Sequence, residues 1–264
     1  MSNQNRRSLP VVREAVAELP APVPAVPPPL FVSKNSKTGF SVNVAITLSC
    51  RPTEACSRYC YGKAGPIAMR AAVNRQEQNF HRLRWLAEAP PSVVATEADM
   101  VYWHVKPYAN FLRFFGVGDL QPGSVKLIKT LAKRHPDLAL WVATRKFDLA
   151  LDLPFVRNVH VMLGLDSTTK GADLHAAYEL VRERAPQFYG SWVQREADEV
   201  IPAWVQVVFA VHRGSNRAKW SAEAEDVRLC EATRAGEKGA EHEGACGTCR
   251  RCFDVSVREA RRQK

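Results

Sequence analysis

The stretch SVNVAITLSCRPTEACSRYCY, residues 41–61, joins two different signals and decides how the rest of the chain is interpreted. Its first part, residues 41–48, is rich in β-branched residues, which is typical of a strand. Its second part places Cys50, Cys56 and Cys60 within eleven residues. We therefore predict a strand that leads directly into a cysteine-bearing loop.

Apolar strands alternate with helices along the following 150 or so residues. Further strands are expected at residues 111–117, 138–144, 159–165 and 204–211, and helices at residues 67–88, about 123–134 and 172–185. Strands that alternate with helices indicate a parallel sheet, and strands this apolar indicate burial on both faces. The predicted fold class is α/β.

Polar residues follow each predicted strand. The cysteines follow the first strand, and the later strands are followed by Gly116-Val117-Gly118-Asp119, by Thr144 and Arg145, by Asp166, and by His212. A (β/α) barrel collects such residues at the carboxyl ends of its strands. Strand-to-helix loops are polar in any α/β protein, and Asp119 would also suit a helix cap in an ordinary turn. We favour a partial (β/α) barrel over a doubly wound sheet.

The three clustered thiols point to a metal centre. Thiolates are soft ligands that suit an iron–sulfur cluster or zinc. A structural zinc ion would need a fourth ligand, whereas three thiolates on a [4Fe–4S] cluster leave one iron open. Three buried cysteines that bind nothing are the alternative without a metal.

A second group of cysteines lies near the end of the chain, at Cys230, Cys246, Cys249 and Cys252. Four thiolates would close a tetrahedral zinc site or ligate a second [4Fe–4S] cluster. Alternatively, one of these four cysteines would ligate the fourth iron of the first cluster, which would then have no open iron. The sequence leaves these alternatives open.

Composition divides the chain into three parts. Residues 1–36 are a Pro-rich leader, 37–217 are the α/β domain, and 218–264 are a cysteine-rich tail with a basic end. No run of apolar residues is long enough to span a membrane, and the beginning of the chain lacks the apolar stretch of a signal peptide, so a cytoplasmic location is expected. The net charge of +10 allows a nucleic-acid partner through the basic tail, although a solvated basic terminus explains it equally well.

The order of these motifs resembles two known groups. Three cysteines after a first strand are similar to the radical SAM superfamily, although the spacing here is CxxxxxCxxxC rather than CxxxCxxC. The wider pattern resembles the gene product 88 family of phages and plasmids. The matching elements are Cys60-Tyr61, FFGVGDL at 114–120, VATRK at 142–146, LGLD at 163–166 and the cysteines at 246–252.

The resemblance implies a radical-SAM-like enzyme. Cys50, Cys56 and Cys60 would hold a [4Fe–4S] cluster whose open iron takes S-adenosylmethionine, and an electron donor would reduce the cluster. The cofactor-binding residues implied are Gly116, Gly118, Asp119, Thr144, Arg145 and Asp166. The substrate, small or macromolecular, stays open. A metal-stabilised nucleic-acid-binding protein and a non-catalytic iron–sulfur protein are the alternative functions.

Overall fold

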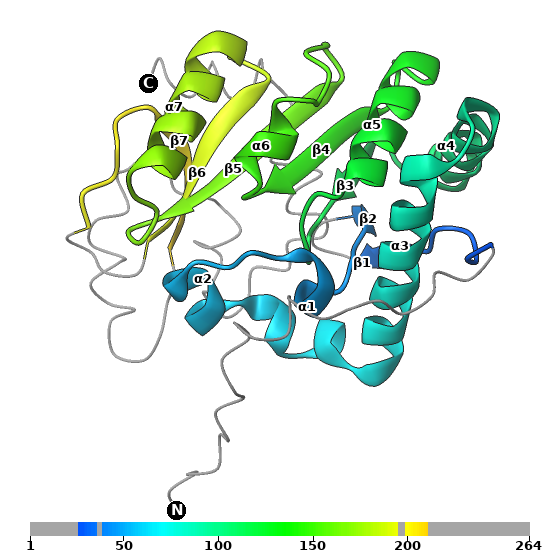
Figure 1. Cartoon of the computed structure of the whole chain (residues 1–264), viewed down its shortest axis with the longest axis horizontal. Helices are drawn as coiled ribbons and strands as arrows, with labels where there is room; N and C mark the ends of the chain where they lie inside the picture. Colours follow the sequence, from blue (N-terminus) through cyan, green and yellow to red (C-terminus); the bar gives the residue numbers. More distant parts are fainter. Residues whose placement is uncertain (1–25, 36–38, 195–198, 211–264) are drawn as a thin grey trace, which may run out of the picture.

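Apolar strands form a seven-stranded sheet in which neighbours in sequence are neighbours in space (Figure 1). The computed structural model describes residues 26–35, 39–194 and 199–210. The strands are β1 (Val32–Asn35), β2 (Gly39–Val42), β3 (Phe111–Phe114), β4 (Ala139–Thr144), β5 (Val159–Asp166), β6 (Phe188–Gln194) and β7 (Val205–Ala210). β1 is antiparallel to β2, and the strands from β2 to β7 are parallel. The sheet thus has no reversal of strand order of the kind that defines a doubly wound fold.

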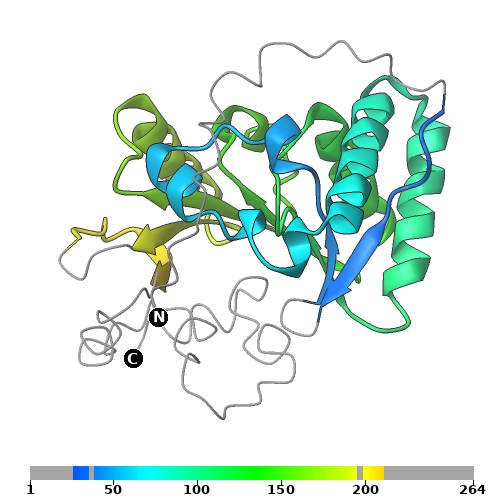
Figure 2. The same ribbon diagram turned by 90° about the horizontal axis from the view of Figure 1, so that it is seen from below.

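Seven α-helices lie in the described part of the chain. They are α1 (Ile46–Ser49), α2 (Glu54–Tyr59), α3 (Arg70–Glu88), α4 (Pro91–Val105), α5 (Pro122–Arg134), α6 (Phe147–Ala150) and α7 (Ala172–Arg184), with short 3-10 turns at Tyr61–Lys63 and Pro66–Ala68. The long helices α3, α5 and α7 lie on the same side of the sheet (Figure 2). None of the helices within the described residues is long and apolar enough to cross a membrane.

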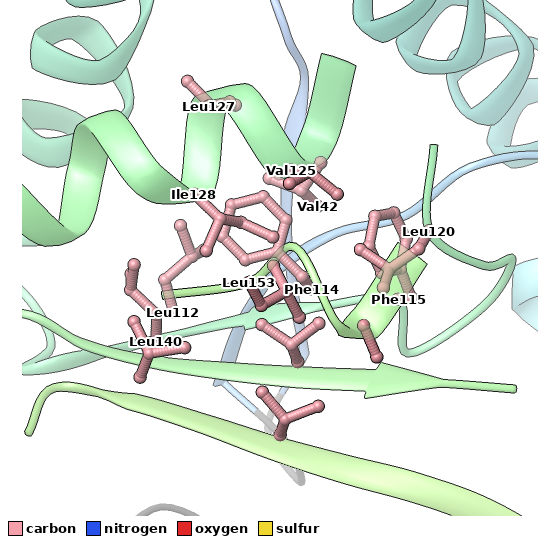
Figure 3. Packing of buried hydrophobic residues seen from close by; sticks show 14 of the residues in the cluster. Val42, Leu112, Phe114, Phe115, Leu120, Val125, Leu127, Ile128, Leu140 and Leu153 are labelled. Carbon is pink, nitrogen blue, oxygen red and sulfur yellow. The ribbon is translucent and has the colours of Figure 1, made fainter. Parts of the chain in front are cut away.

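The main core lies between the sheet and its helices. Leu112 and Phe114 of β3 pack toward Ile128 of α5, and all three are fully buried (Figure 3). Burying a side chain of this size contributes about 1.5–3 kcal/mol relative to leaving it exposed. Gly123 lets α5 approach α3, because a Cβ there would lie 1.7 Å from the Leu83 carbonyl oxygen.

The opposite face of the sheet carries a different set of side chains. Side chains alternate between faces along a strand, so registered partners on parallel strands share a face. Ser41 pairs with Arg113, Arg113 with Trp141, and Trp141 with His160. Trp141 forms a second buried cluster there, with Met162, Tyr189 and Val207. This face therefore combines polar groups with a small apolar cluster.

Most of the predicted elements are confirmed, but the first strand is shorter than predicted. The strand expected at 41–48 ends at Val42, and Ile46–Ser49 is the helical turn α1. The Ser49 amide and hydroxyl both donate to the Ala45 carbonyl, which closes the turn. β-branched residues favour strands only weakly, and the tertiary environment overrides that preference here.

Several elements were not predicted from the sequence, namely α2, α4, α6, β1 and β6. α4 begins directly at Pro91, which suits the first position of a helix, and it buries Val94, Ala98, Val101 and Val105 at helical spacing. β6 contains Gly190, where a Cβ would lie 2.5 Å from the Trp204 ring, so the strand needs a glycine there. β1 falls within the Pro-rich leader, as an edge strand.

Candidate functional site

The cysteine-bearing segment lies across the carboxyl ends of the central strands (Figure 1). The Thr53 hydroxyl donates to Asp166 Oδ2 at the end of β5, at 2.6 Å. The Asp119 amide, beyond β3, donates to Ser49 Oγ at 3.1 Å. These two bonds fix Ser49 and Thr53, on either side of Cys50, to the edge of the sheet, and Thr53 is the N-cap of the helix that carries Cys56.

Two short helices position the thiols. Cys50 follows α1 as its C-cap, and Cys60 is the C-cap of α2. Cys56 lies inside α2, and its amide donates to the side chain of the N-cap Thr53 at 3.1 Å. A side-chain oxygen at this position satisfies an amide that the helix leaves without a partner. Thr53 therefore sets the orientation of the turn that carries Cys56.

The three thiols lie close enough to influence one another electrostatically. Burial, together with the charges of Asp119, Cys56 and Cys60, raises the pKa of Cys50 to about 12, although the Ser49 hydroxyl opposes the rise. Burial also raises the pKa of Cys56, an effect that the Arg145 guanidinium opposes and Cys60 strengthens. Without a bound cation, both thiols are protonated at neutral pH. A metal would have to displace their protons, as thiolate ligation requires.

Asp119 is a buried carboxylate that joins β3 to β4. Its Oδ1 accepts the Thr144 hydroxyl at 2.6 Å and the Leu120 amide at 2.8 Å, and both oxygens accept the Arg145 amide at 3.3 Å. Burial raises its pKa, although these bonds and nearby Lys146 oppose the rise. Asp119 thus fixes the end of β4 and adds a negative charge beneath Cys50.

The segment between β3 and Asp119 makes a tight turn against the residues that connect β2 to α1. Gly118 has a φ of 86°, and a Cβ there would lie 2.4 Å from the Val44 carbonyl oxygen. Phe115 also has a positive φ, of 62°, which is uncommon for a bulky residue. The Val117 amide donates to Asn43 Oδ1 at 3.0 Å, which holds the turn against the segment after β2. Glycine is therefore required at 118 by the packing.

Arg145 and Asp166 form a buried ion pair behind α2. Arg145 Nη2 lies 2.8 Å from Asp166 Oδ2, and its Nη1 lies 3.2 Å from Thr53 Oγ1. Asp166 Oδ1 accepts the amide and hydroxyl of Thr168. Burial opposes ionisation of Asp166, but Arg145 and the hydrogen bonds from Thr168 and Thr53 hold its pKa below the usual value. The pair links β4, β5 and the start of α2.

Lys146 lies on the other side of the same edge. Its Nζ donates to the Leu120 carbonyl at 2.8 Å. Burial lowers its pKa, and Arg51 adds to this, whereas Asp119 and Cys50 raise it. The ammonium therefore connects the segment that follows β4 to the segment that follows β3.

The residues predicted from the sequence meet at this edge in part. The structure brings together Cys50, Cys56, Cys60, Gly116, Gly118, Asp119, Thr144, Arg145 and Asp166. The predicted ligands Cys230, Cys246, Cys249 and Cys252, together with His212, lie outside the described residues. Sequence reasoning missed Ser49 and Thr53, whose partners Asp119 and Asp166 lie 70 and 113 residues away. No local sequence signal marks such pairs.

The donor chemistry of the three thiols fits a soft metal centre. In the ranges that the structure describes, no group of three or more His, Cys, Asp or Glu side chains stands in metal-binding geometry. Cys50, Cys56 and Cys60 are each half-buried and lie at the ends or within the first turn of short helices. Ligation would need their side chains to turn toward a common point, and thiolates are the ligands that iron–sulfur clusters use.

Comparisons with known proteins agree with the pattern of motifs. Neither the curated proteins nor the solved structures gave a match to this chain. Residues 26–255, which include the whole described fold, match the family described as gene product 88. The chain therefore belongs to the gene product 88 family.

Proposed function

We propose that this protein is an iron–sulfur enzyme of the radical-SAM-like type, with the described sheet as a partial (β/α) barrel. The observation that carries the proposal is the position of Cys50, Cys56 and Cys60 across the carboxyl ends of parallel strands. The sequential strand order supports an open barrel, because each crossover moves one strand further in the same direction. Thiolate ligation needs reduced cysteines, which fits a cytoplasmic location.

The three thiolates would ligate three irons of a [4Fe–4S] cluster. When bound, the cluster would supply the electron that cleaves S-adenosylmethionine at its sulfonium. The electron would come from a separate donor. The four distal cysteines, Cys230, Cys246, Cys249 and Cys252, would hold a second cluster or a zinc ion. Seven cysteines divide into these three and four without remainder.

The surrounding residues would order the site and bind the cofactor. The turn at Gly116 and Gly118 brings backbone close to the cysteine edge, where a methionine amino group could reach its carbonyls. Arg145 carries a positive charge beside Cys56, and its contact with Thr53 orders the start of α2. Asp119 and Thr144 hold the strand ends in place, and Asp166 neutralises Arg145. These hydrogen-bonded polar side chains would therefore be ordered on one side of the thiols before a cofactor binds.

Anaerobic purification followed by iron and sulfide analysis tests the proposal. We expect Cys56→Ala to contain about four fewer irons per chain than the wild type, because one missing thiolate destabilises a cluster held by three. Cys246→Ala is the matched control, which should leave the first cluster intact. The reduced wild-type protein should then form 5′-deoxyadenosine from S-adenosylmethionine, with a change in the EPR spectrum on adding the cofactor.

Two results would contradict this function. Equal iron content in the wild type and Cys56→Ala would exclude the first cysteine group as a cluster site. The second result is a fully loaded and reduced protein that forms no 5′-deoxyadenosine and has an EPR spectrum that does not change when S-adenosylmethionine is added. This result would indicate a non-catalytic iron–sulfur protein.

Basic side chains around the cysteine segment favour nucleic acid as a second candidate partner. Arg51, Arg70 and Arg75 are exposed between residues 51 and 75, where Glu54 is the single acidic residue. Binding that depends on phosphate contacts falls steeply as salt increases. Titration of a single-stranded oligonucleotide at several salt concentrations tests this candidate, and weak binding that ignores salt would exclude it.

A further inference from the structure

The sheet face opposite the helices carries an arginine that the proposed function does not use. Arg113 lies on β3, and its registered neighbours on that face are Ser41 of β2 and Trp141 of β4. Phe114, the next residue, points the other way into the main core. Arg113 is half-buried, so part of its side chain stays reachable.

Within the described ranges, the guanidinium of Arg113 has an aromatic contact but no anionic one. Its Cζ lies 4.4 Å from the centroid of the Trp141 ring. Its Nε is buried and has no hydrogen-bond partner, and no carboxylate of the described residues forms an ion pair with it. Arginine stays charged at any pH at which proteins fold, and a buried charge without a counter-ion is unfavourable. Among the residues that the structure describes, the guanidinium therefore lacks a negative partner.

Ser41 supplies a second polar atom beside it. Ser41 is 1% exposed, and its Oγ has no hydrogen-bond partner in the part of the chain that the structure describes. A buried hydroxyl that bonds to nothing also costs free energy. The register places Ser41 directly opposite Arg113 on the neighbouring strand. Two buried donors without acceptors thus lie side by side on one face of the sheet.

The same guanidinium reaches the turn at the edge of the candidate site. A Cβ on Gly116 would lie 3.5 Å from both Cζ and Nη1 of Arg113. Gly116 begins the Gly-Val-Gly-Asp turn that ends at Asp119, whose amide bonds to Ser49 in the cysteine segment. A ligand held by Arg113 would therefore lie below the cysteine edge, on the face of the sheet opposite the long helices.

We propose that Arg113 and Ser41 bind an oxyanion of the substrate, either a carboxylate or a phosphate group. The planar fork of arginine matches the two oxygens of either group, and the Trp141 ring holds the guanidinium in one plane. The Ser41 hydroxyl donates to the same group. Describing the ligand as the substrate rests on the proposed function, whereas anion binding itself needs no cluster.

Binding to the full-length protein tests the site, with inorganic phosphate, adenosine monophosphate and succinate as probes. Calorimetric or fluorescence titrations are made at constant ionic strength, before and after iron reconstitution. We expect saturable binding of at least one probe, and the preferred probe distinguishes phosphate from carboxylate. Arg113→Gln should weaken it by roughly 10- to 100-fold, because a charged hydrogen bond is lost, and Ser41→Ala by severalfold.

Arg184→Gln is the matched control, because it removes an equal charge from another arginine that lies over an aromatic ring, 5.3 Å from the Phe188 centroid. Arg113→Lys keeps the charge and should bind with intermediate affinity, so it carries the test if Arg113→Gln fails to fold. Absence of saturable binding for all three probes, or equal affinity in wild type and Arg113→Gln, overturns the site. Anion binding in a protein that forms no 5′-deoxyadenosine supports the site and contradicts the proposed function alone.

Discussion

Two buried arginine–carboxylate pairs lie in different parts of this molecule. Arg82 of α3 pairs with Glu97 of α4, at 2.5 Å from Nη2 to Oε2. Arg145 pairs with Asp166 at the carboxyl ends of β4 and β5, at 2.8 Å. The carboxylate is almost completely buried in each pair, at 1% and 0% side-chain exposure, so burial does not separate them.

The partners of the two pairs differ in kind. The Arg82–Glu97 pair bonds to backbone: Arg82 Nη1 donates to the Pro27 carbonyl, and Glu97 Oε1 accepts the Leu30 amide. The Arg145–Asp166 pair bonds instead to Thr53, which caps the helix that carries Cys56. The first pair fastens the end of the Pro-rich leader to two helices, and the second orders a candidate ligand. The same chemistry thus gives stability in one region and site geometry in the other.

The largest expected effect is on folding, at the first pair. Glu97→Ala leaves the Arg82 guanidinium buried without its anion and should lower the free energy of unfolding by about 3–5 kcal/mol. Urea denaturation measures the loss. The double variant Arg82→Met with Glu97→Leu should lose less, because no charge stays buried. A single variant as stable as the wild type would show that the pair is not what holds the leader.

A smaller loss of stability, with a larger loss of iron, is expected at the second pair. Arg145→Met leaves Asp166 buried without its cation, but Thr53 and Thr168 still donate to it. The free energy of unfolding should fall by about 2–3 kcal/mol. Iron per folded chain should fall as well, measured by metal analysis beside urea denaturation. An unchanged iron content per folded chain in Arg145→Met, or a lower iron content in Glu97→Ala, would contradict the distinction between the two pairs.

Loss of the helix cap should have a milder effect. Thr53→Val removes the oxygen that accepts the Cys56 amide, and this should cost about 1 kcal/mol of stability. Iron should dissociate faster, as measured by chelator competition. Thr130→Val is the matched control, because the Thr130 hydroxyl donates to a backbone carbonyl inside α5, away from the cysteines. Identical chelation rates in the two variants would contradict a positioning role for Thr53.

The smallest effect is expected at a surface pair and depends on pH. The Arg134 hydrogen bond and His135 hold the pKa of Asp99 below its usual value, although partial burial opposes this. A lowered pKa in the folded state means that Asp99 stabilises the protein above about pH 4, and that this contribution disappears as the pH falls further. The stability difference between wild type and Asp99→Asn should therefore shrink in acid. A difference that grows in acid would reverse this assignment.

The fold was more predictable than the contacts of the site. Alternating apolar strands and helices predicted β4, β5, α5 and α7 because their period and length are local properties. α4 was missed, although Pro91 is a helix-start signal, because a second proline directly precedes it. The first strand was predicted too long because Ile46, Thr47 and Leu48 are β-branched or apolar and yet lie in a helical turn.

The sequence by itself determined the chemistry that is present. It placed three thiols after a strand, a glycine turn with a carboxylate after the next strand, and a Thr-Arg pair after the third. These choices are local, because a thiol or a glycine has the same chemistry wherever the chain carries it.

Only the tertiary structure decided which of these groups meet. Thr53 and Asp166 are 113 residues apart, and they meet because Thr53 follows β2 and Asp166 ends β5, two strands that run in the same direction within one sheet. Arg113 lies beside Ser41 and Trp141 because of strand register, and a shift of one residue would have turned it into the core. Such contacts depend on the packing of the whole sheet, since hydrogen bonds between distant residues form only after register is fixed.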